Sequence, residues 1–185
     1  MHLFDQNLLN SRILVIDDDI SISTIIKESL KNDGFKNILT LSNGEEGLKN
    51  FADYDPDLVI LDMQMPIMDG IEFLEKINVK PSDNFSIIVL TGKIEDESIE
   101  KAFGLGINAY LRKPFNTFAL KGIVKQNLLL KKIQNDLNEQ LELKNEIELK
   151  LREDKLHFMG LVQDKLTQKE KDMFMEELFN FFDNE

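Results

Sequence analysis

Five polar side chains in this sequence could together carry out phosphoryl chemistry. Each stands at or just after the end of a short apolar run, and they are Asp17, Asp18, Asp62, Thr91 and Lys113. If those runs are neighbouring strands of one sheet, the five side chains converge on a single crevice. Acidic residues are common in loops, and none of the five is informative alone. Their joint occurrence in one order is what favours a site.

The carboxylates of Asp17, Asp18 and Asp62 repel one another if they meet. A like-charge pair about 4 Å apart costs roughly 4 kcal/mol at an effective dielectric constant of about 20. Such a cluster therefore needs protons or a cation to offset it. Oxygen ligands without histidine or cysteine favour Mg²⁺, with Mn²⁺ as the alternative.

A phosphate group fits the same crevice. Lys113 can pair with phosphate oxygens as a point charge, and the Thr91 hydroxyl can donate a hydrogen bond to them. A carboxylate beside Mg²⁺, a lysine and a hydroxyl is equipped to attack phosphorus. The product of that attack is an aspartyl phosphate.

The elements that must position these groups alternate between strand and helix. Strands are predicted at 13–16, 38–41, 58–61, 87–90 and 109–111. Helices are predicted between them and after the last strand, with Asp69 capping the third and Ser42 or Asn43 capping the second. The strands are continuously apolar, as a parallel sheet covered on both faces requires. The pattern predicts a doubly wound α/β fold of about 120 residues with its ligand site outside the carboxyl ends of the strands.

Four stretches of sequence carry a family resemblance. They are ILVIDDD at 13–19, DLVILDMQMPIMDGIEFL at 57–74, IIVLTG at 87–92 and AYLRKPF at 109–115. The chain resembles the CheY-like receiver domain of two-component response regulators from residue 12 to about 130. The resemblance implies a five-stranded parallel sheet in the order 2-1-3-4-5. It also implies a cis peptide bond before Pro114.

The resemblance implies a role for each site residue. Asp62 would be the phosphoacceptor, and Asp18, Asp62 and the backbone carbonyl of Gln64 would bind Mg²⁺. Asp17 would act on the metal through water. Thr91 would bond the phosphoryl group, Lys113 would pair with it, and Tyr110 would be the switch aromatic that turns inward. Asp19 is expected to be a solvated loop residue and not a ligand.

Composition excludes several other classes of protein. The 185 residues carry 34 acidic and 22 basic side chains, a net charge of −12, which argues against nucleic-acid binding. Cysteine is absent, which excludes disulfides and thiolate metal sites. No apolar run approaches the roughly 18 residues of a membrane span, and residues 1–10 are not expected to form a signal peptide. We therefore expect a cytoplasmic protein.

Beyond residue 115 the chain is nearly free of helix breakers, and a long helix is predicted to about Gly160. A helix from 117 to 160 would be about 65 Å long. Seven of ten heptad core positions are apolar, with a at Leu130, Leu137, Lys144, Leu151 and Phe158 and d at Ile133, Gln140, Ile147, Asp154 and Leu161. This spacing favours a two-stranded coiled coil, although one amphipathic helix packed on its own domain or in a bundle would also fit.

The predicted organisation is a receiver at 1–118, a long helix at 119–164 and a short helix at 165–185. A histidine kinase or phosphotransfer protein would phosphorylate Asp62, making the chain a signalling phosphoacceptor and not an enzyme. The signal would change homodimerisation through the helical tail and the face formed by helix 96–103, strand 109–111 and the following helix. The alternatives are a non-cycling adaptor or coiled-coil scaffold, or the receiver of a longer regulator whose effector domain is missing here.

Overall fold

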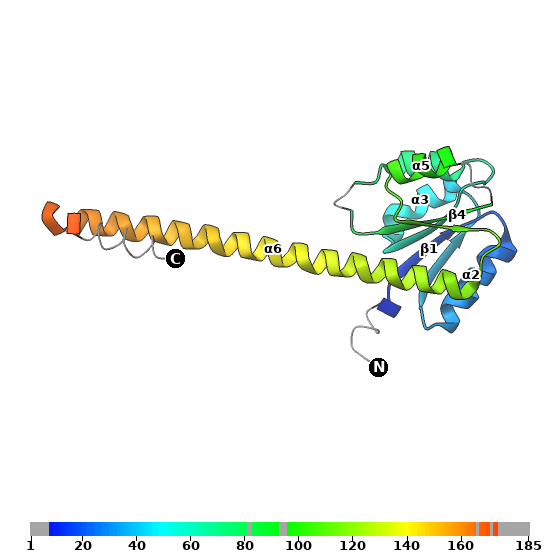
Figure 1. The fold of residues 1–185 in the computed structure, drawn as a ribbon, viewed down its shortest axis with the longest axis horizontal. Helices are drawn as coiled ribbons and strands as arrows, with labels where there is room; N and C mark the ends of the chain where they lie inside the picture. Colours follow the sequence, from blue (N-terminus) through cyan, green and yellow to red (C-terminus); the bar gives the residue numbers. More distant parts are fainter. Residues whose placement is uncertain (1–7, 81–82, 93–95, 166, 171, 174–185) are drawn as a thin grey trace. The chain divides into compact units, whose positions relative to one another are not determined.

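The computed structural model describes residues 8–80, 83–92, 96–165, 167–170 and 172–173. Strands and helices alternate along the first part of the chain (Figure 1). The strands are β1 (Arg12–Ile16), β2 (Asn37–Leu41), β3 (Leu58–Asp62), β4 (Ser86–Thr91) and β5 (Ala109–Arg112). The helices are α2 (Ile20–Asn32), α3 (Gly44–Tyr54), α4 (Gly70–Ile77), α5 (Asp96–Gly104) and α6 (Thr117–Lys165).

The five strands form one parallel sheet in the order β2-β1-β3-β4-β5. The predicted fold class and strand order are confirmed. Each strand is one residue longer than predicted at one end, and β4 at both ends, so Asp62 and Thr91 are the last residues of their strands rather than the first residues after them. Both side chains are therefore held by the sheet itself.

The sheet is covered on both faces, as Figure 1 shows. Alternate strand residues point to opposite faces. Ile13 and Val15 of β1 pack with residues of α2 and the start of α6, whereas Leu14 and Ile16 pack with residues of α4 and α5. The two apolar layers cover the central strands, so β3 and β4 contain no exposed residue, whereas the edge strands β2 and β5 are only partly buried.

Side-chain caps fix where the helices begin. Asp69 accepts a hydrogen bond from the backbone of Glu72, and the Glu72 carboxylate accepts one from the backbone of Asp69, which completes a capping box at α4. Asn43 caps α3, one of the two predicted candidates. Asp19 is exposed, as expected, but it also caps α2 by accepting bonds from the backbone of Ser21 and Ile22. That capping role was not predicted.

Helix α6 runs without interruption from Thr117 to Lys165. Its first turns belong to the α/β unit, because Leu120, Val124 and Leu128 are buried in the core. Lys121 and Lys125 form ion pairs with Asp33 at the end of α2, at 3.4 and 2.6 Å. The hydrogen bond from Lys125 lowers the pKa of Asp33 despite its partial burial.

The chain divides into two compact units, residues 1–135 and 136–185. The predicted division at residues 118 and 164 stays a prediction. Thr167 and Glu170 form a further capping contact after α6, and most of the predicted helix at 165–185 lies outside the described residues. Within the described part of the chain, no helix has the length and apolar character needed to cross a membrane.

Two glycines give a matched test of this packing. A Cβ at Gly47 would lie 2.5 Å from Ile16 Cδ1 and 3.1 Å from Phe73 Cε2, whereas a Cβ at Gly122 in α6 would meet nothing within 4 Å. We expect Gly47→Ala to lower the free energy of unfolding by about 1–3 kcal/mol through overpacking. Gly122→Ala should raise it by about 0.5–1 kcal/mol through helix propensity. Urea titrations followed by circular dichroism measure both, and a neutral or stabilising Gly47→Ala would contradict the packing described here.

Candidate functional site

The candidate site lies at the carboxyl edge of the parallel sheet. Strand register brings its parts together, because Ile16 of β1 pairs with Leu61 of β3 and Asp62 pairs with Leu90 of β4. Asp17 after β1, Asp62 at the end of β3 and Thr91 at the end of β4 therefore lie at the same edge of the sheet. The backbone N–H of Lys113 donates to the carbonyl of Thr91 at 2.7 Å. This bond holds Lys113, which follows β5, next to the end of β4 at the same edge.

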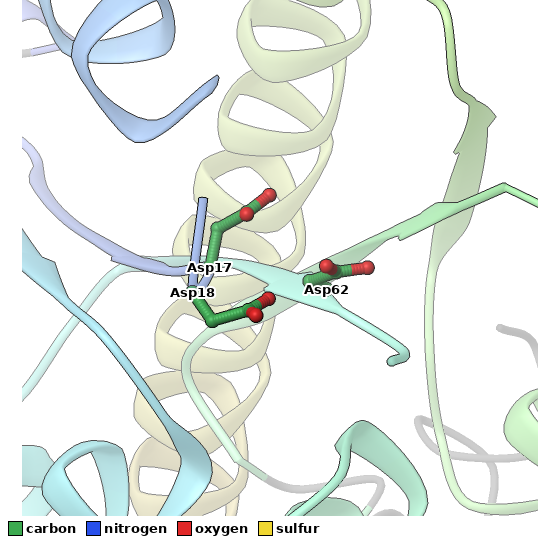
Figure 2. Close-up of side chains that lie close together, drawn as sticks. All are labelled: Asp17, Asp18 and Asp62. Carbon is green, nitrogen blue, oxygen red and sulfur yellow. The ribbon is translucent and has the colours of Figure 1, made fainter. Parts of the chain in front are cut away.

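Three carboxylates gather at this edge, as predicted. Asp17 and Asp18 come from the end of β1 and Asp62 from the end of β3 (Figure 2). One carboxylate oxygen from each lies within 4.8 Å of the others. Asp17 and Asp62 are buried, whereas Asp18 is exposed to solvent. The cluster is thus buried at Asp17 and Asp62 and open to solvent at Asp18.

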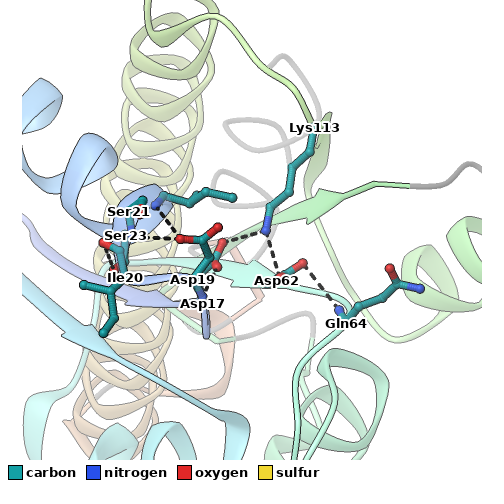
Figure 3. Close-up of polar contacts among 9 residues, drawn as sticks. Asp17, Asp19, Ile20, Ser21, Ser23, Asp62, Gln64 and Lys113 are labelled. Atoms are coloured by element: carbon teal, nitrogen blue, oxygen red, sulfur yellow. Dashed lines mark hydrogen bonds and ion pairs between the residues drawn. The ribbon is translucent and has the colours of Figure 1, made fainter.

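Lys113 holds the two buried carboxylates. Its Nζ lies 2.7 Å from Asp17 Oδ2 and 2.8 Å from Asp62 Oδ2, and Figure 3 shows it between them. The Asp17 side chain has no exposed surface, and the Lys113 side chain is 17% exposed. The sequence predicted Lys113 as a phosphate partner but not this double ion pair with the carboxylates. The peptide bond from Lys113 to Pro114 is cis, as the resemblance implied.

Burial and charge shift the titration of this pair in definite directions. Burial raises the pKa of Asp17, and the hydrogen bonds from Lys113 and from the backbone of Asp19 only partly oppose it. Burial alone would lower the pKa of Lys113, but its hydrogen bonds and charge interactions with Asp17 and Asp62 together raise that pKa above its ordinary 10.5. The lysine therefore stays charged at neutral pH, whereas desolvation disfavours the charged form of Asp17.

The loop after β3 brings a backbone group to Asp62. The backbone N–H of Gln64 lies 3.4 Å from Asp62 Oδ1. In the same loop Ile67 has a positive φ of 72°, and the N–H of Met68 donates to the carbonyl of Pro66 at 2.8 Å. A β-branched residue in this conformation forms a strained three-residue turn. No sequence signal indicated it, because glycine or asparagine usually marks such a position.

Thr91 and Tyr110 lie beside a cavity of about 240 Å³ that they both line. Thr91 is 5% exposed and ends β4. Tyr110 is 40% exposed, and its ring lies edge-on to Phe103 with 6.2 Å between centroids. The cavity is also lined by Met63, Val89, Ile99, Ala102 and Ile107. The predicted inward turn of Tyr110 therefore has space beside Thr91.

The site residues suit a small divalent cation. All three clustered groups are carboxylates, the hard oxygen ligands that Mg²⁺ and Mn²⁺ prefer. The exposed position of Asp18 leaves room for water in the metal's coordination shell, which Mg²⁺ usually keeps in part. The negative charge exceeds what Lys113 neutralises, because three carboxylates face one ammonium group within this cluster.

The family comparison decides what kind of domain carries this site. Residues 13–125 match the family model of the response regulator receiver domain. The chain belongs to this family. The matched residues, 13–125, include every site residue described above.

Named relatives support the assignment. The receiver is 38% identical to PhoP, the alkaline phosphatase synthesis transcriptional regulatory protein of Bacillus subtilis, over 63% of this chain and 48% of that protein. It is 33% identical to sporulation initiation phosphotransferase F of the same organism, over 67% of this chain and 98% of that protein. The chain thus spans about half the length of PhoP.

Two further comparisons extend these findings. The probable transcriptional regulator ycf29 of Pyropia yezoensis is 32% identical over 169 residues, 88% of this chain and 74% of that protein. Among solved structures, a CheY-like receiver domain protein from Methanospirillum hungatei matches with a TM-score of 0.63 and 29% identity. That match covers 68% of this chain and 98% of the other.

The three consecutive aspartates provide a test of the electrostatics. Because the folded pKa of Asp17 is raised, its charge costs stability at neutral pH, and this cost is relieved as the pH falls through the folded pKa. We expect Asp17→Asn to raise the urea midpoint of the metal-free protein at pH 7, with the gain shrinking in acid. Asp19→Asn is the control, because asparagine caps a helix as well as aspartate does. If Asp17→Asn raised the urea midpoint by the same amount at every pH, the charge of Asp17 would not be the source of the stability cost.

Proposed function

We propose that the protein is a two-component response regulator that accepts a phosphoryl group on Asp62. The donor is a histidine kinase or a phosphotransfer protein, and the reaction depends on Mg²⁺. The observation that carries this proposal is the contact of Lys113 with both Asp62 and Asp17, inside a cluster that also includes Asp18. A structural role alone gives no reason to gather three carboxylates at a place where a lysine pairs with only two of them.

The proposed reaction follows from these positions. An Asp62 carboxylate oxygen attacks the phosphorus of a phosphohistidine, a P–O bond forms, and the P–N bond breaks with its electron pair passing to the imidazole nitrogen. Lys113, already 2.8 Å from Asp62, is placed to pair with the phosphoryl oxygens. The Thr91 hydroxyl is proposed to donate to the same group. Asp62 becomes an acyl phosphate, and water later hydrolyses it.

Asp18, Asp62 and the Gln64 carbonyl would hold the metal ion, with Asp17 acting through water. When bound, the ion supplies positive charge that offsets the carboxylates and the incoming phosphoryl oxygens. The residues themselves orient the nucleophile, since Gln64 N–H and Lys113 bind opposite oxygens of Asp62. The protein's own chemistry is limited to gaining and losing this phosphoryl group, so we propose a signalling protein and not an enzyme. We place this activity in the cytoplasm, where kinases draw on ATP.

Phosphorylation is proposed to act through Thr91 and Tyr110. Movement of Thr91 toward the phosphoryl group would enlarge the space beside Tyr110, and the ring would turn into the cavity that both residues line. That turn would change the face built from α5, β5 and the first part of α6. Because α6 continues into the tail, we propose that the signal is transmitted as a change in homodimerisation through this face and the helix.

Transcriptional regulation is a second candidate output. It is favoured by the match of ycf29, named a probable transcriptional regulator, over 169 residues. The acidic net charge of −12 weighs against direct binding to a DNA duplex. A DNA gel shift that persists at physiological salt would favour this candidate, and its absence would favour an output through protein contacts.

Phosphorylation of Asp62 is directly testable. Incubation with acetyl phosphate and Mg²⁺ should add the mass of one phosphoryl group to the intact protein. We expect Asp62→Asn to lose this gain entirely, because its amide cannot form an acyl phosphate. Asp19→Asn, in the same acidic neighbourhood, should retain it. If mass spectrometry showed that the Asp62→Asn protein still gains a phosphoryl group, Asp62 would not be the acceptor.

Mg²⁺ binding can be tested without phosphorylation. A ligand that binds only the folded state stabilises it by mass action and so raises the melting temperature. At a ligand concentration a hundred times Kd, the free energy of unfolding rises by about 2.7 kcal/mol. We expect Mg²⁺ to raise the melting temperature of the unmodified protein and EDTA to reverse the rise. Asp18→Asn should remove most of the effect, whereas Asp19→Asn should preserve it. An equal rise in Asp18→Asn would show that the ion binds elsewhere.

A further inference from the structure

The second half of α6 is exposed to solvent, with one exception. From residue 136 to 160 every side chain is exposed except that of Met159, which is half-buried. Leu156 and Phe158 on the same helix are 64% and 54% exposed, so α6 alone does not cover side chains of this size. The partial burial of Met159 therefore indicates that another segment packs near it.

A cavity of about 540 Å³ lies on the same side of α6. The described residues that line it are Asn145, Glu148, Leu149 and Arg152. Together with Met159 they occur at positions i, i+3, i+4, i+7 and i+14, which places all five on one side of the helix. A single helix is convex, so a cavity beside it needs a second segment opposite. We call these five residues the inner side of α6.

The inner side is distinct from the apolar stripe that the heptad positions form. Ile147, Leu151 and Phe158 belong to this stripe and are 50%, 62% and 54% exposed. A stripe of this kind is suited to contact with a further helix. The segment that packs near Met159 thus leaves the stripe exposed, and the surface it contacts is the inner side.

A second helix begins almost directly after α6. Helix α6 ends at Lys165, and the backbone N–H of Thr167 donates to the Glu170 carboxylate at 2.9 Å, a contact typical of a capping box. Residues 168–170 and 172–173 are helical. Only residues 166 and 167 therefore connect the two helices. Helices joined by about two to five residues commonly pack as antiparallel neighbours.

The sequence after residue 173 predicts that this helix continues with one apolar side. Apolar residues recur at i, i+4, i+7 and i+8, and they are Phe174, Leu178, Phe181 and Phe182. Met175 and Phe179 fall outside this spacing. The described residues Asp172 and Met173 lie on the other side of the same helical pattern and are exposed, Met173 by 62%. A helix from 168 to 185 would be about 27 Å long, which equals the length of α6 from 148 to 165.

We propose that residues 168–185 fold back on α6 as an antiparallel helix and cover its inner side. With the turn at 166 and 167, residue 174 lies beside Met159 and residue 181 beside Arg152. Phe174 then packs on the Met159 thioether, and the ring of Phe181 packs on the guanidinium of Arg152. The two-residue connection favours this segment over a separate molecule, because it holds the helix next to the surface that it covers. The inference does not rest on phosphorylation of Asp62.

Paired nitroxide labels test the direction of the second helix, since the sequence contains no cysteine of its own. The full chain carries the labels at Glu153→Cys and Asn180→Cys, at equal distances from the turn and outside the packed sides. Helix axes in a hairpin are about 8–10 Å apart, so we expect the nitroxides within about 20 Å of each other. A right-angled corner would separate the two positions by about 28 Å, and a straight continuation by about 40 Å. Electron paramagnetic resonance measures the separation.

Two apolar residues of the second helix test which of its sides packs on α6. Leu178→Asn should reduce the fraction of short label separations by at least about half, because it places an amide in the apolar contact. Met173→Asn is the matched control, since Met173 is 62% exposed, and it should leave that fraction unchanged. Circular dichroism of both variants checks that the receiver still melts at the same temperature.

The label measurements are made with labelled chains diluted in an excess of unlabelled chains, so that each measured pair lies within one chain. Short separations that disappear on dilution would show that the segment covers a second copy, which overturns the proposal. Separations near 28 or 40 Å would also overturn it, because they correspond to a corner or a straight helix. Equal effects of Leu178→Asn and Met173→Asn would show that the apolar side does not hold the hairpin together.

Discussion

The rest of the structure depends on keeping three carboxylates together at the edge of a parallel sheet. Strand register places the end of β1 beside β3, which brings Asp17, Asp18 and Asp62 close together. Lys113 offsets part of the negative charge from the end of β5. The remaining charge makes the site receptive to a cation, and the open position of Asp18 gives that cation access.

Much of the fold could be predicted because its signals are local. Continuously apolar strands such as 58–61 indicate a parallel sheet, and Asp69 followed by Glu72 indicates a helix start. The gathering of Asp17, Asp18, Asp62 and Lys113 could also be predicted, since each lies at or just after a strand end and parallel strands end at one edge. The family resemblance then supplied the strand order and the cis bond before Pro114, and both are confirmed.

The features that were missed depend on three-dimensional detail. The double ion pair of Lys113 requires knowing that two carboxylate oxygens face the same ammonium group, and residue spacing does not give that. The turn at Ile67 places a β-branched residue where its own preference is unfavourable, so propensity points away from it. Asp19 was expected to be a solvated loop residue. It accepts capping bonds from the backbone of Ser21 and Ile22, and the only sequence signal for this role was an aspartate placed directly before a helix.

Helix α6 joins two kinds of environment in one continuous element. Its first turns are buried at Leu120 and Val124 and paired with Asp33, whereas the residues after 136 belong to the second unit and expose their apolar stripe. In the proposed function, this continuous helix would connect the receiver that contains Asp62 to the tail. The proposed signalling role therefore needs no separate connecting segment within the described residues.

The central claim is that the carboxylate cluster at the sheet edge binds one divalent ion beside Asp62. Anomalous diffraction from crystals grown with Mn²⁺ tests it most directly. We expect one strong peak within coordination distance of Asp18, Asp62 and the Gln64 carbonyl, with Lys113 still beside the cluster. A peak elsewhere, or an acidic edge without metal at saturating Mn²⁺, would contradict it.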